Sequence, residues 1–195
     1  ISQVSSEKTI SIIKKAKNEG KIFTSGVSIN NLSLNENDIG DFKTFLKLSP
    51  PLRTEKDRIA LVNAIGDGTI DVIVSDHKPE DEESKRLTFS QAATGASGIE
   101  TLLPLALELF HNKSLKLHSI IAAVTSNPSK ILNIKKGSLN IGYDADICIL
   151  DIDKPFVVEK NKLKSKSKNT PIEDRKLQGQ ILKTFIKGKI EFEYK

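Results

Sequence analysis

The alternation of helix-like segments with short apolar strands is the feature that most restricts what this chain can fold into. An apolar stub, residues 1–4, is followed by an amphipathic stretch that begins after two serines and ends at Gly20. Serine before the first turn and glycine after the last are typical helix caps. Apolar runs at 21–28 and 70–74 have the length of strands, and a second helix-like stretch, opened by Thr54, lies between them. The order strand, helix, strand, loop, helix, strand predicts parallel βα units.

The pattern changes in the last third of the chain. Two more helices are expected at 99–110 and 117–125, and Pro128 is expected to stop helical structure because proline lacks an amide hydrogen. Beyond these helices the sequence is typical of short strands and turns. We therefore expect two parts, βα units in residues 1–135 and a small β module in residues 136–195.

The β module is expected to form one sheet. Residues 137–150 and 180–194 should pair in it, with Gly188 in a hairpin turn. Apolar and polar residues alternate in the last strand, which predicts one solvent-exposed face and one buried face. Cys148 lies within an apolar strand and is expected in the core rather than as a nucleophile.

The composition excludes several classes of protein. No apolar run approaches the roughly 18 residues that a membrane-spanning helix needs. Cys148 is the only cysteine, so an internal disulfide is impossible, and three histidines are few for an all-histidine metal site. The first residues lack the basic and apolar regions of a secretory signal, so a cytoplasmic location is expected. Because the chain has no methionine, we expect it to be a fragment or a processed product.

Positive charge is concentrated near the carboxyl end. The net charge of the chain is +5, whereas residues 154–195 hold 12 Lys and Arg against 5 Asp and Glu, a balance of +7. The lysines of residues 160–168 alternate with residues that are not aromatic, and no nucleic-acid-binding motif is present. A solvated loop is the favoured interpretation over a basic arm, so nucleic-acid binding is not expected.

A carboxylate and an imidazole follow the second expected strand. Asp76 and His77 come just after residues 70–74, and in parallel βα architectures functional residues collect at the carboxyl ends of strands. A carboxylate there can bind a metal ion or act as a general base. The alternative is that Asp76 only caps the loop and that His77 is a hydrogen-bonded structural residue. The glycine pair Gly95 and Gly98, before the next helix, is a weak indication of an anion site.

Several motifs, in this order along the chain, resemble those of dihydroorotases, which are cyclic amidohydrolases of pyrimidine biosynthesis. The first three are residues 49–53 (SPPLR), 75–79 (SDHKP) and 94–103 (TGASGIETLL). Three more are residues 125–131 (TSNPSKI), 136–147 (KGSLNIGYDADI) and 167–171 (SKNTP). The resemblance extends through essentially the whole chain.

This resemblance implies a fold, an activity and a cofactor. The implied α/β fold is the later part of a (β/α)8 amidohydrolase barrel, in residues 1–135, with a small β-sandwich-like module in residues 136–195. The implied reaction is the reversible cyclisation of N-carbamoyl-L-aspartate to dihydroorotate, by a protein that we expect to be an oligomer. Zinc is expected for the family. The family's His-x-His zinc motif has no match here, so zinc binding is expected to be weak or absent in this chain.

The resemblance also gives expected roles to six residues. Asp76 falls on the catalytic aspartate, which binds metal and transfers the proton. Gln3 stands at a degenerate metal-ligand position where the family has histidine. The expected substrate-binding positions are Ser49, Glu80, Thr94 and Gly95. Ser49 and Glu80 depart from the asparagine and histidine usual there, and a carboxylate at Glu80 is expected to repel a dianionic substrate.

Two functions remain open at this point. The first is a dihydroorotase in which Asp76 takes and returns the proton. The second is a non-catalytic dihydroorotase-like subunit that supports aspartate carbamoyltransferase. Gln3, Ser49 and Glu80 favour the second function, whereas Asp76 and Gly95 are compatible with both. On its own the chain is expected to be inactive.

Overall fold

The structure is a computed structural model that describes residues 1–194. It holds a two-stranded parallel sheet surrounded by helices and a three-stranded antiparallel sheet. The helices are α1 (Glu7–Asn18), α2 (Ile29–Ser33), α3 (Glu55–Gly66), α4 (Glu82–Arg86), α5 (Leu102–His111), α6 (Leu117–Val124) and α7 (Ser126–Ile131). The strands are β1 (Gly26–Ser28), β2 (Val72–Val74), β3 (Ile147–Val157), β4 (Lys176–Ile186) and β5 (Lys189–Glu193). Short 3₁₀ turns occupy Glu36–Ile39, Thr44–Leu46 and Lys160–Lys162.

The first two long helices are capped as the sequence predicts, and they are joined at their starts. Ser6 caps α1 by accepting a hydrogen bond from the Thr9 amide, and Thr54 caps α3 through the Asp57 amide. The Asp57 carboxylate in turn accepts a hydrogen bond from the Glu7 amide at 2.8 Å. One carboxylate therefore serves the amino ends of both helices, where the helix dipole favours negative charge.

The register of the parallel strands is fixed by Asp71, which directly precedes β2. Its carboxylate accepts a hydrogen bond from the Ser25 amide at 2.7 Å, and Ser25 directly precedes β1. Lys17, in the last turn of α1, pairs with the same carboxylate at 3.0 Å. Asn127 of α7 donates to the Asp71 carbonyl oxygen at 2.8 Å. A single residue thus connects both strands to the two helices α1 and α7.

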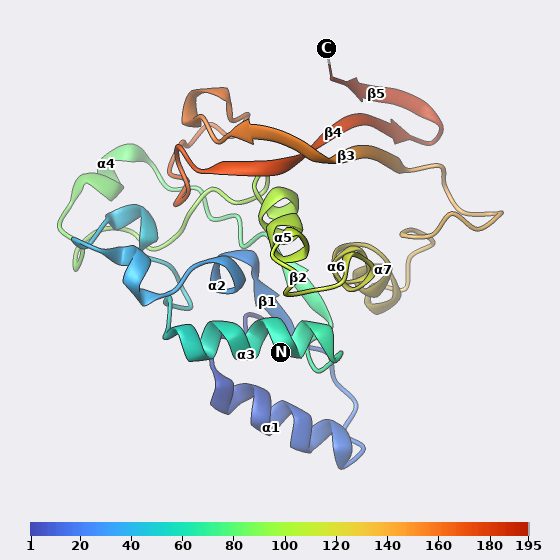
Figure 1. Cartoon of the computed structure of the whole chain (residues 1–195), viewed down its shortest axis with the longest axis horizontal. Helices are drawn as coiled ribbons and strands as arrows, with labels where there is room; N and C mark the ends of the chain where they lie inside the picture. The colour runs from blue at the N-terminus through green and yellow to red at the C-terminus, as the bar shows by residue number, and fades with distance from the viewer. Residues whose placement is uncertain (195) are drawn as a thin grey trace.

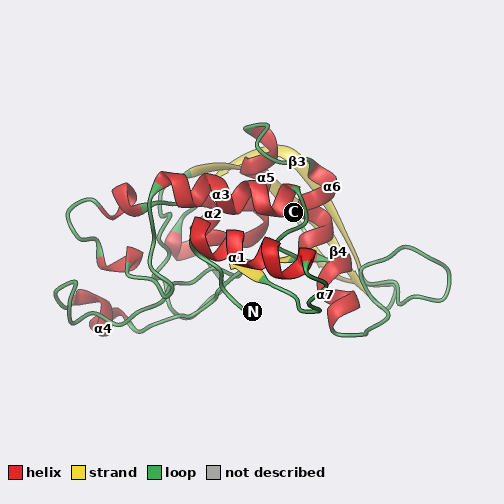
Figure 2. Ribbon diagram, turned by 90° about the horizontal axis from the view of Figure 1, so that it is seen from below, coloured by secondary structure: helices red, strands yellow, loops and turns green. Residues whose placement is uncertain are grey.

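The helices form layers around the parallel sheet. In Figure 1, α1 and α3 lie below β1 and β2, α5 and α6 lie above, and the antiparallel sheet crosses the top. Figure 2 shows α4 at one end of the molecule, apart from the group formed by α1, α3, α5 and α6. The core is made of aliphatic side chains from these helices and strands, among them Val27, Ile29, Leu61, Leu105 and Ile120. No helix in residues 1–194 is both long and apolar enough to cross a membrane.

The antiparallel sheet has the strand order β3-β4-β5 and is attached to the rest of the molecule through α5. Arg175 pairs with Glu108 of α5 through both carboxylate oxygens, at 3.0 and 2.8 Å. The ring of His111, at the end of α5, bonds the Ile152 carbonyl oxygen of β3 at 2.9 Å. Gly188 turns the chain between β4 and β5 with φ +78°. The predicted pairing of residues 137–150 with 180–194 is confirmed for residues 147–150, whereas residues 137–146 form no strand and β3 continues to Val157.

Several sequence-based predictions of local structure are wrong. Pro128 does not stop helical structure, because it lies in the first turn of α7, where a missing amide hydrogen costs no hydrogen bond. Cys148 is exposed rather than in the core. Both faces of β5 are exposed instead of one. Alternation predicts a buried face only where another layer covers the sheet, and residues 1–194 place no layer over this part.

The contact between β4 and α5 gives a testable prediction. Gly179 has φ +105°, and a Cβ atom there would overlap the Leu107 side chain. Gly142 has φ +91° in an open loop with no atom near that position. We expect Gly179→Ala to lower the free energy of unfolding by about 2–4 kcal/mol, from backbone strain plus overpacking. Gly142→Ala should lower it by about 1 kcal/mol, from strain alone. Urea unfolding of both variants measures the difference, and equal losses would contradict the packing explanation.

Candidate functional site

One residue of the amino-terminal stub and one residue that follows β2 have unusual backbone conformations. Gln3, at the end of the stub that hydrogen-bonds along β1, has φ +56°, and Asp76, which follows β2, has φ +48°. Neither residue is glycine, so each is held in a left-handed conformation that side chains disfavour. Such strain persists only where surrounding contacts enforce it, and it gathers at functional sites.

The two strained residues contact each other. Gln3 Nε2 donates a hydrogen bond to Asp76 Oδ1, and the Lys78 ammonium lies 3.5 Å from the same oxygen. The Asp76 side chain is only 5% exposed, so this carboxylate is removed from bulk water. Lys78 Nζ also donates to the Ser49 carbonyl oxygen at 3.3 Å. The Asp76 carboxylate therefore joins Gln3 to Lys78, and Lys78 extends the group to the backbone of Ser49.

These residues do not fit a zinc ion. Zinc in proteins is held by several deprotonated sulfur, nitrogen or carboxylate ligands. At Asp76, one carboxylate oxygen receives an amide N–H and faces an ammonium, and both of those groups repel a cation. Within residues 1–194 no cluster of three or more His, Cys, Asp or Glu side chains is placed to hold a metal. The donor set around Asp76 is built to neutralise a carboxylate rather than to complete a metal site.

A second cluster is organised by Asn169, which lies between β3 and β4 and is 2% exposed. Its Oδ1 accepts hydrogen bonds from the Glu80 amide at 3.3 Å and from the Ser97 hydroxyl at 3.1 Å. Its Nδ2 donates to the Gly95 carbonyl oxygen at 3.1 Å. The Ser167 hydroxyl, which has one hydrogen to donate, lies within hydrogen-bond distance of both Asn169 Oδ1 and the Glu80 carbonyl oxygen. The oxygen and the nitrogen of this one buried amide are therefore both hydrogen-bonded. They hold the loop of Glu80 and the loop of Gly95 and Ser97 to the segment 167–169.

Gly95 is required by the close approach of these loops. It has φ +148°, and a Cβ atom there would lie 2.6 Å from the Lys78 carbonyl oxygen. The Gly95 amide donates to the Lys47 carbonyl oxygen at 3.0 Å, so its backbone is fixed on both sides. Any larger residue would push the Gly95 loop away from the loop that carries Lys78 and Glu80.

A buried lysine also holds the loop that contains Gly95. Lys85 of α4 is 1% exposed, and its ammonium donates to the carbonyl oxygens of Thr44 and Ala93, at 3.0 and 2.8 Å. Burial lowers the pKa of Lys85 from its usual value, and the negative charge of Glu80 opposes that shift. The Lys85 ammonium and the Asn169 side-chain amide thus hold together the segments that carry Thr44, Glu80 and Gly95.

His77 is a hydrogen-bonded structural residue, as the alternative interpretation proposed. Its Nδ1 accepts from the Gly98 amide at 3.1 Å and faces the Ile99 amide at 3.3 Å. Because Nδ1 accepts, a neutral ring carries its hydrogen on Nε2. The role of Gly98 is also structural, since a Cβ atom there would overlap the Ser75 carbonyl oxygen.

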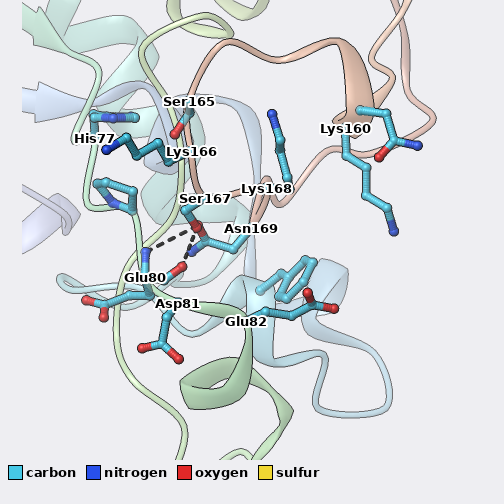
Figure 3. A pocket seen from close by; sticks show the side chains of 13 residues that line it. His77, Glu80, Asp81, Glu82, Lys160, Ser165, Lys166, Ser167, Lys168 and Asn169 are labelled. Carbon is cyan, nitrogen blue, oxygen red and sulfur yellow. Dashed lines mark hydrogen bonds between the residues drawn. The ribbon is translucent and has the colours of Figure 1, made fainter.

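A large pocket lies beside the Asn169 cluster, not at the Asp76 carboxylate. It has a volume of about 770 Å³ and carries acidic residues on one wall and lysines on the other, namely Glu80, Asp81, Glu82, Lys160, Lys166 and Lys168. Figure 3 shows these walls, with dashed hydrogen bonds joining Glu80, Ser167 and Asn169 at the base. Gln3 lines a separate, smaller pocket with Val72, Val74 and Ile131.

The expected site residues thus fall into two groups. Gln3 contacts Asp76, and Lys78 contacts both Asp76 and the Ser49 backbone, whereas Glu80 and Gly95 meet around Asn169. Thr94 is exposed beside Gly95, and its side chain makes no hydrogen bond within residues 1–194. Sequence reasoning missed the roles of Lys78, Lys85 and Asn169. The motifs 75–79 and 167–171 contain two of them, but a lysine or asparagine in a loop carries no signal of its partners.

The chain is similar to known proteins in both sequence and structure. The profile of the amidohydrolase family matches residues 4–190. Among solved structures, L-hydantoinase (dihydropyrimidinase) from Arthrobacter aurescens superposes with a TM-score of 0.93 at 28% identity, over 98% of this chain and 44% of that one. The dihydropyrimidinase of Brevibacillus agri superposes with a TM-score of 0.90 at 21% identity and so shows the fold alone. The chain belongs to the amidohydrolase family.

Within that family, the similar curated proteins are named dihydroorotases. The protein of Ehrlichia canis (strain Jake) is 40% identical over 192 residues, which is 98% of this chain and 43% of the relative. The protein of Acetivibrio thermocellus is 40% identical over 191 residues, 97% of this chain and 45% of the relative. The resemblance to dihydroorotases is therefore confirmed. The chain spans less than half the length of these relatives.

The Asn169 cluster gives a second prediction. Asn169→Ala leaves the Glu80 amide and the Gly95 carbonyl oxygen without their partner, so we expect a loss of about 2–4 kcal/mol in the free energy of unfolding. Asn161→Ala, in the exposed part of the same segment, should change it by less than about 0.5 kcal/mol. Amide hydrogen exchange should also accelerate at residues 78–82 and 95–98 in the first variant only. Unchanged exchange there would contradict the role of Asn169.

Proposed function

We propose that this chain is the later part of a dihydroorotase-type protein and serves pyrimidine biosynthesis. Dihydroorotases interconvert N-carbamoyl-L-aspartate and dihydroorotate. The dihydroorotase names of relatives at 35–40% identity over nearly the whole chain support this proposal. The retained Asp76, at the carboxyl end of β2, supports it as well.

Asp76 is the residue of this chain that can move a proton in that reaction. Both contacts described above fall on Oδ1, so Oδ2 carries neither of them. A carboxylate oxygen at the end of a parallel strand can accept a proton during ring opening and return it during ring closure. The Gln3 amide and the Lys78 ammonium hold the other oxygen, which fixes the direction of Oδ2.

The pairing of Asp76 with Gln3 and Lys78 is the single observation that bears on whether the isolated chain can be catalytic. It uses the carboxylate to bind groups that exclude a cation, so no metal-assisted step can be derived from residues 1–194. We therefore propose that the isolated chain does not turn over dihydroorotate.

The same observation favours a second candidate, a non-catalytic dihydroorotase-like subunit that supports aspartate carbamoyltransferase. Gln3 stands where the resemblance to dihydroorotases implies a histidine, and the Lys78 ammonium faces the Asp76 carboxylate, so the means of holding a catalytic cation is lacking here. Glu80 adds a carboxylate near the expected position of a dianionic substrate. A scaffold that keeps its loops in place through Asn169 and Lys85 retains a well-formed surface without needing catalysis.

An assay of the purified chain tests these proposals. We expect no ring opening of dihydroorotate above the uncatalysed rate, with or without added zinc, and less than stoichiometric zinc by elemental analysis. The Acetivibrio thermocellus dihydroorotase is the positive control. Zinc-dependent turnover by the isolated chain would sink the inactive-chain proposal. Co-elution with aspartate carbamoyltransferase, without turnover, would support the non-catalytic candidate.

Substitution at Asp76's two partners gives a further prediction. Gln3→His alone should leave zinc binding weak, because the Lys78 ammonium still faces the carboxylate. Two like charges 4 Å apart repel by roughly 4 kcal/mol at an effective dielectric of about 20, and solvent around the half-exposed lysine reduces this. Gln3→His with Lys78→Ala should therefore bind zinc at least about tenfold more tightly than Gln3→His, as measured by competition with a chelating dye.

The matched control for that experiment is Lys166→Ala in the Gln3→His background. Lys166 lines the other pocket, so its removal should not change zinc affinity. Equal gains from Lys78→Ala and Lys166→Ala would show that general positive charge, rather than the ammonium beside Asp76, limits metal binding.

A further inference from the structure

The pocket beside Asn169 has the size of a small-molecule binding site. Its volume is about 770 Å³, and such sites typically measure about 300–1,000 Å³. Its walls come from residues 77–82 and 160–169, together with Phe45, and Asp76 is not among the residues that line it. The pocket is therefore formed by internal loops of the chain and not by the regions near its two ends.

The segment that carries the lysine wall is fastened to the rest of the molecule at both of its ends. The Glu100 carboxylate accepts hydrogen bonds from the Lys164 amide, at 2.8 and 2.9 Å, and from the Ser165 amide at 3.1 Å. The Ser97 amide donates to the Asn169 carbonyl oxygen at 3.2 Å. These contacts fix the backbone from which the lysine side chains project, so less order has to be gained when a ligand binds.

His77 and Lys166 supply hydrogen-bond donors to one side of the pocket. Because His77 Nδ1 accepts from the Gly98 amide, the neutral ring carries its hydrogen on Nε2, which makes no hydrogen bond within residues 1–194. The Lys166 ammonium likewise makes no ion pair within residues 1–194. Figure 3 shows the Lys166 side chain extending toward His77. An imidazole N–H and an ammonium together are suited to bind the oxygens of a phosphate or a carboxylate.

The acidic wall carries one carboxylate that is available to a cation. Asp81 caps α4, and Glu82 pairs with Arg86 at 2.7 Å. Glu80 is half-buried, and within residues 1–194 only its backbone is hydrogen-bonded. The Lys85 ammonium senses the charge of Glu80 but donates its hydrogens to carbonyl oxygens. A carboxylate in this position favours an ammonium group on a ligand and disfavours an anionic one.

We propose that this pocket binds a small zwitterion, with its phosphate or carboxylate group at His77 and Lys166 and its ammonium group at Glu80. A purely anionic ligand meets repulsion from Glu80, and a purely cationic ligand meets repulsion from the lysines. A ligand with both charges matches both walls. This inference goes beyond the proposed function, since neither Asp76 nor a metal ion takes part in the binding.

An NMR titration of the full 195-residue chain tests the proposal. The probes are two zwitterions, phosphoethanolamine and β-alanine, and the two matching anions without an ammonium group, ethyl phosphate and propionate. We expect saturable shifts of the amides of residues 80–82 and 165–169. Each zwitterion should bind about threefold or more tightly than its matching anion. The zwitterion that binds more tightly identifies the anionic group that the donors prefer.

Two substitutions separate the two ends of the ligand. Glu80→Gln keeps the backbone contacts of residue 80 and removes only the charge, so it should weaken the zwitterions about three- to fivefold and should not weaken the matching anions. Lys166→Ala should weaken zwitterions and anions alike, by about three- to fivefold. Lys164→Ala is the matched control, because Lys164 is an exposed lysine of the same segment that does not line the pocket.

The control variant should bind all four probes with unchanged affinity, and thermal unfolding checks that each variant keeps its fold. Three results would overturn the proposal. The first is the absence of saturable shifts at residues 80–82 and 165–169 with either zwitterion at millimolar concentration. The second is equal affinity for zwitterions and matching anions, unchanged by Glu80→Gln. The third is an equal loss of affinity in the Lys164→Ala and Lys166→Ala variants. Turnover is not a readout here, so the proposed function can fail without affecting this result.

Discussion

The carboxylate of Asp71 is the contact on which the arrangement of the two strands depends. It bonds the amide of Ser25, so β1 and β2 begin at the same level, and it pairs with Lys17 and thereby fixes α1. Side chains at the opposite ends of the strands inherit that register. Asp76 therefore meets Gln3 across the carboxyl edge of the sheet, and two left-handed residues are kept in conformations that neither would adopt alone.

The site differs in charge from what a metal centre requires. A buried carboxylate with one ammonium beside it is close to neutral overall, so it neither attracts a divalent cation nor repels an anion strongly. The other cluster is different, because it separates an acidic wall from a basic wall across a pocket. The Asp76 carboxylate and the 770 Å³ pocket thus lie in different places. Gly95 packs against the loop of residues 78–80, which contacts Asp76 through Lys78 and lines the pocket through Glu80.

The sequence predicts the parallel βα order, the capped helices and the location of Asp76, because each depends on local signals. Ser6 and Thr54 are recognisable caps, and a strand followed by a carboxylate is recognisable without knowledge of its neighbours. The environment of Cys148 could not be predicted, since an apolar strand is typical of a covered sheet whether or not a cover is present. Asn169 and Lys85 could not be found either, because their partners lie as far as 89 residues away in sequence.

The position of Asn169 along the chain sets the order in which the loops around the large pocket can be completed during synthesis. Its amide bonds Gly95, which is 74 residues earlier, and Glu80, which is 89 residues earlier. At roughly 5–20 residues per second, a ribosome adds that stretch in about 4–18 s, far longer than helix formation takes. For that interval the helices on the nascent chain can already be formed while the loops that carry Glu80 and Gly95 lack their closing contact.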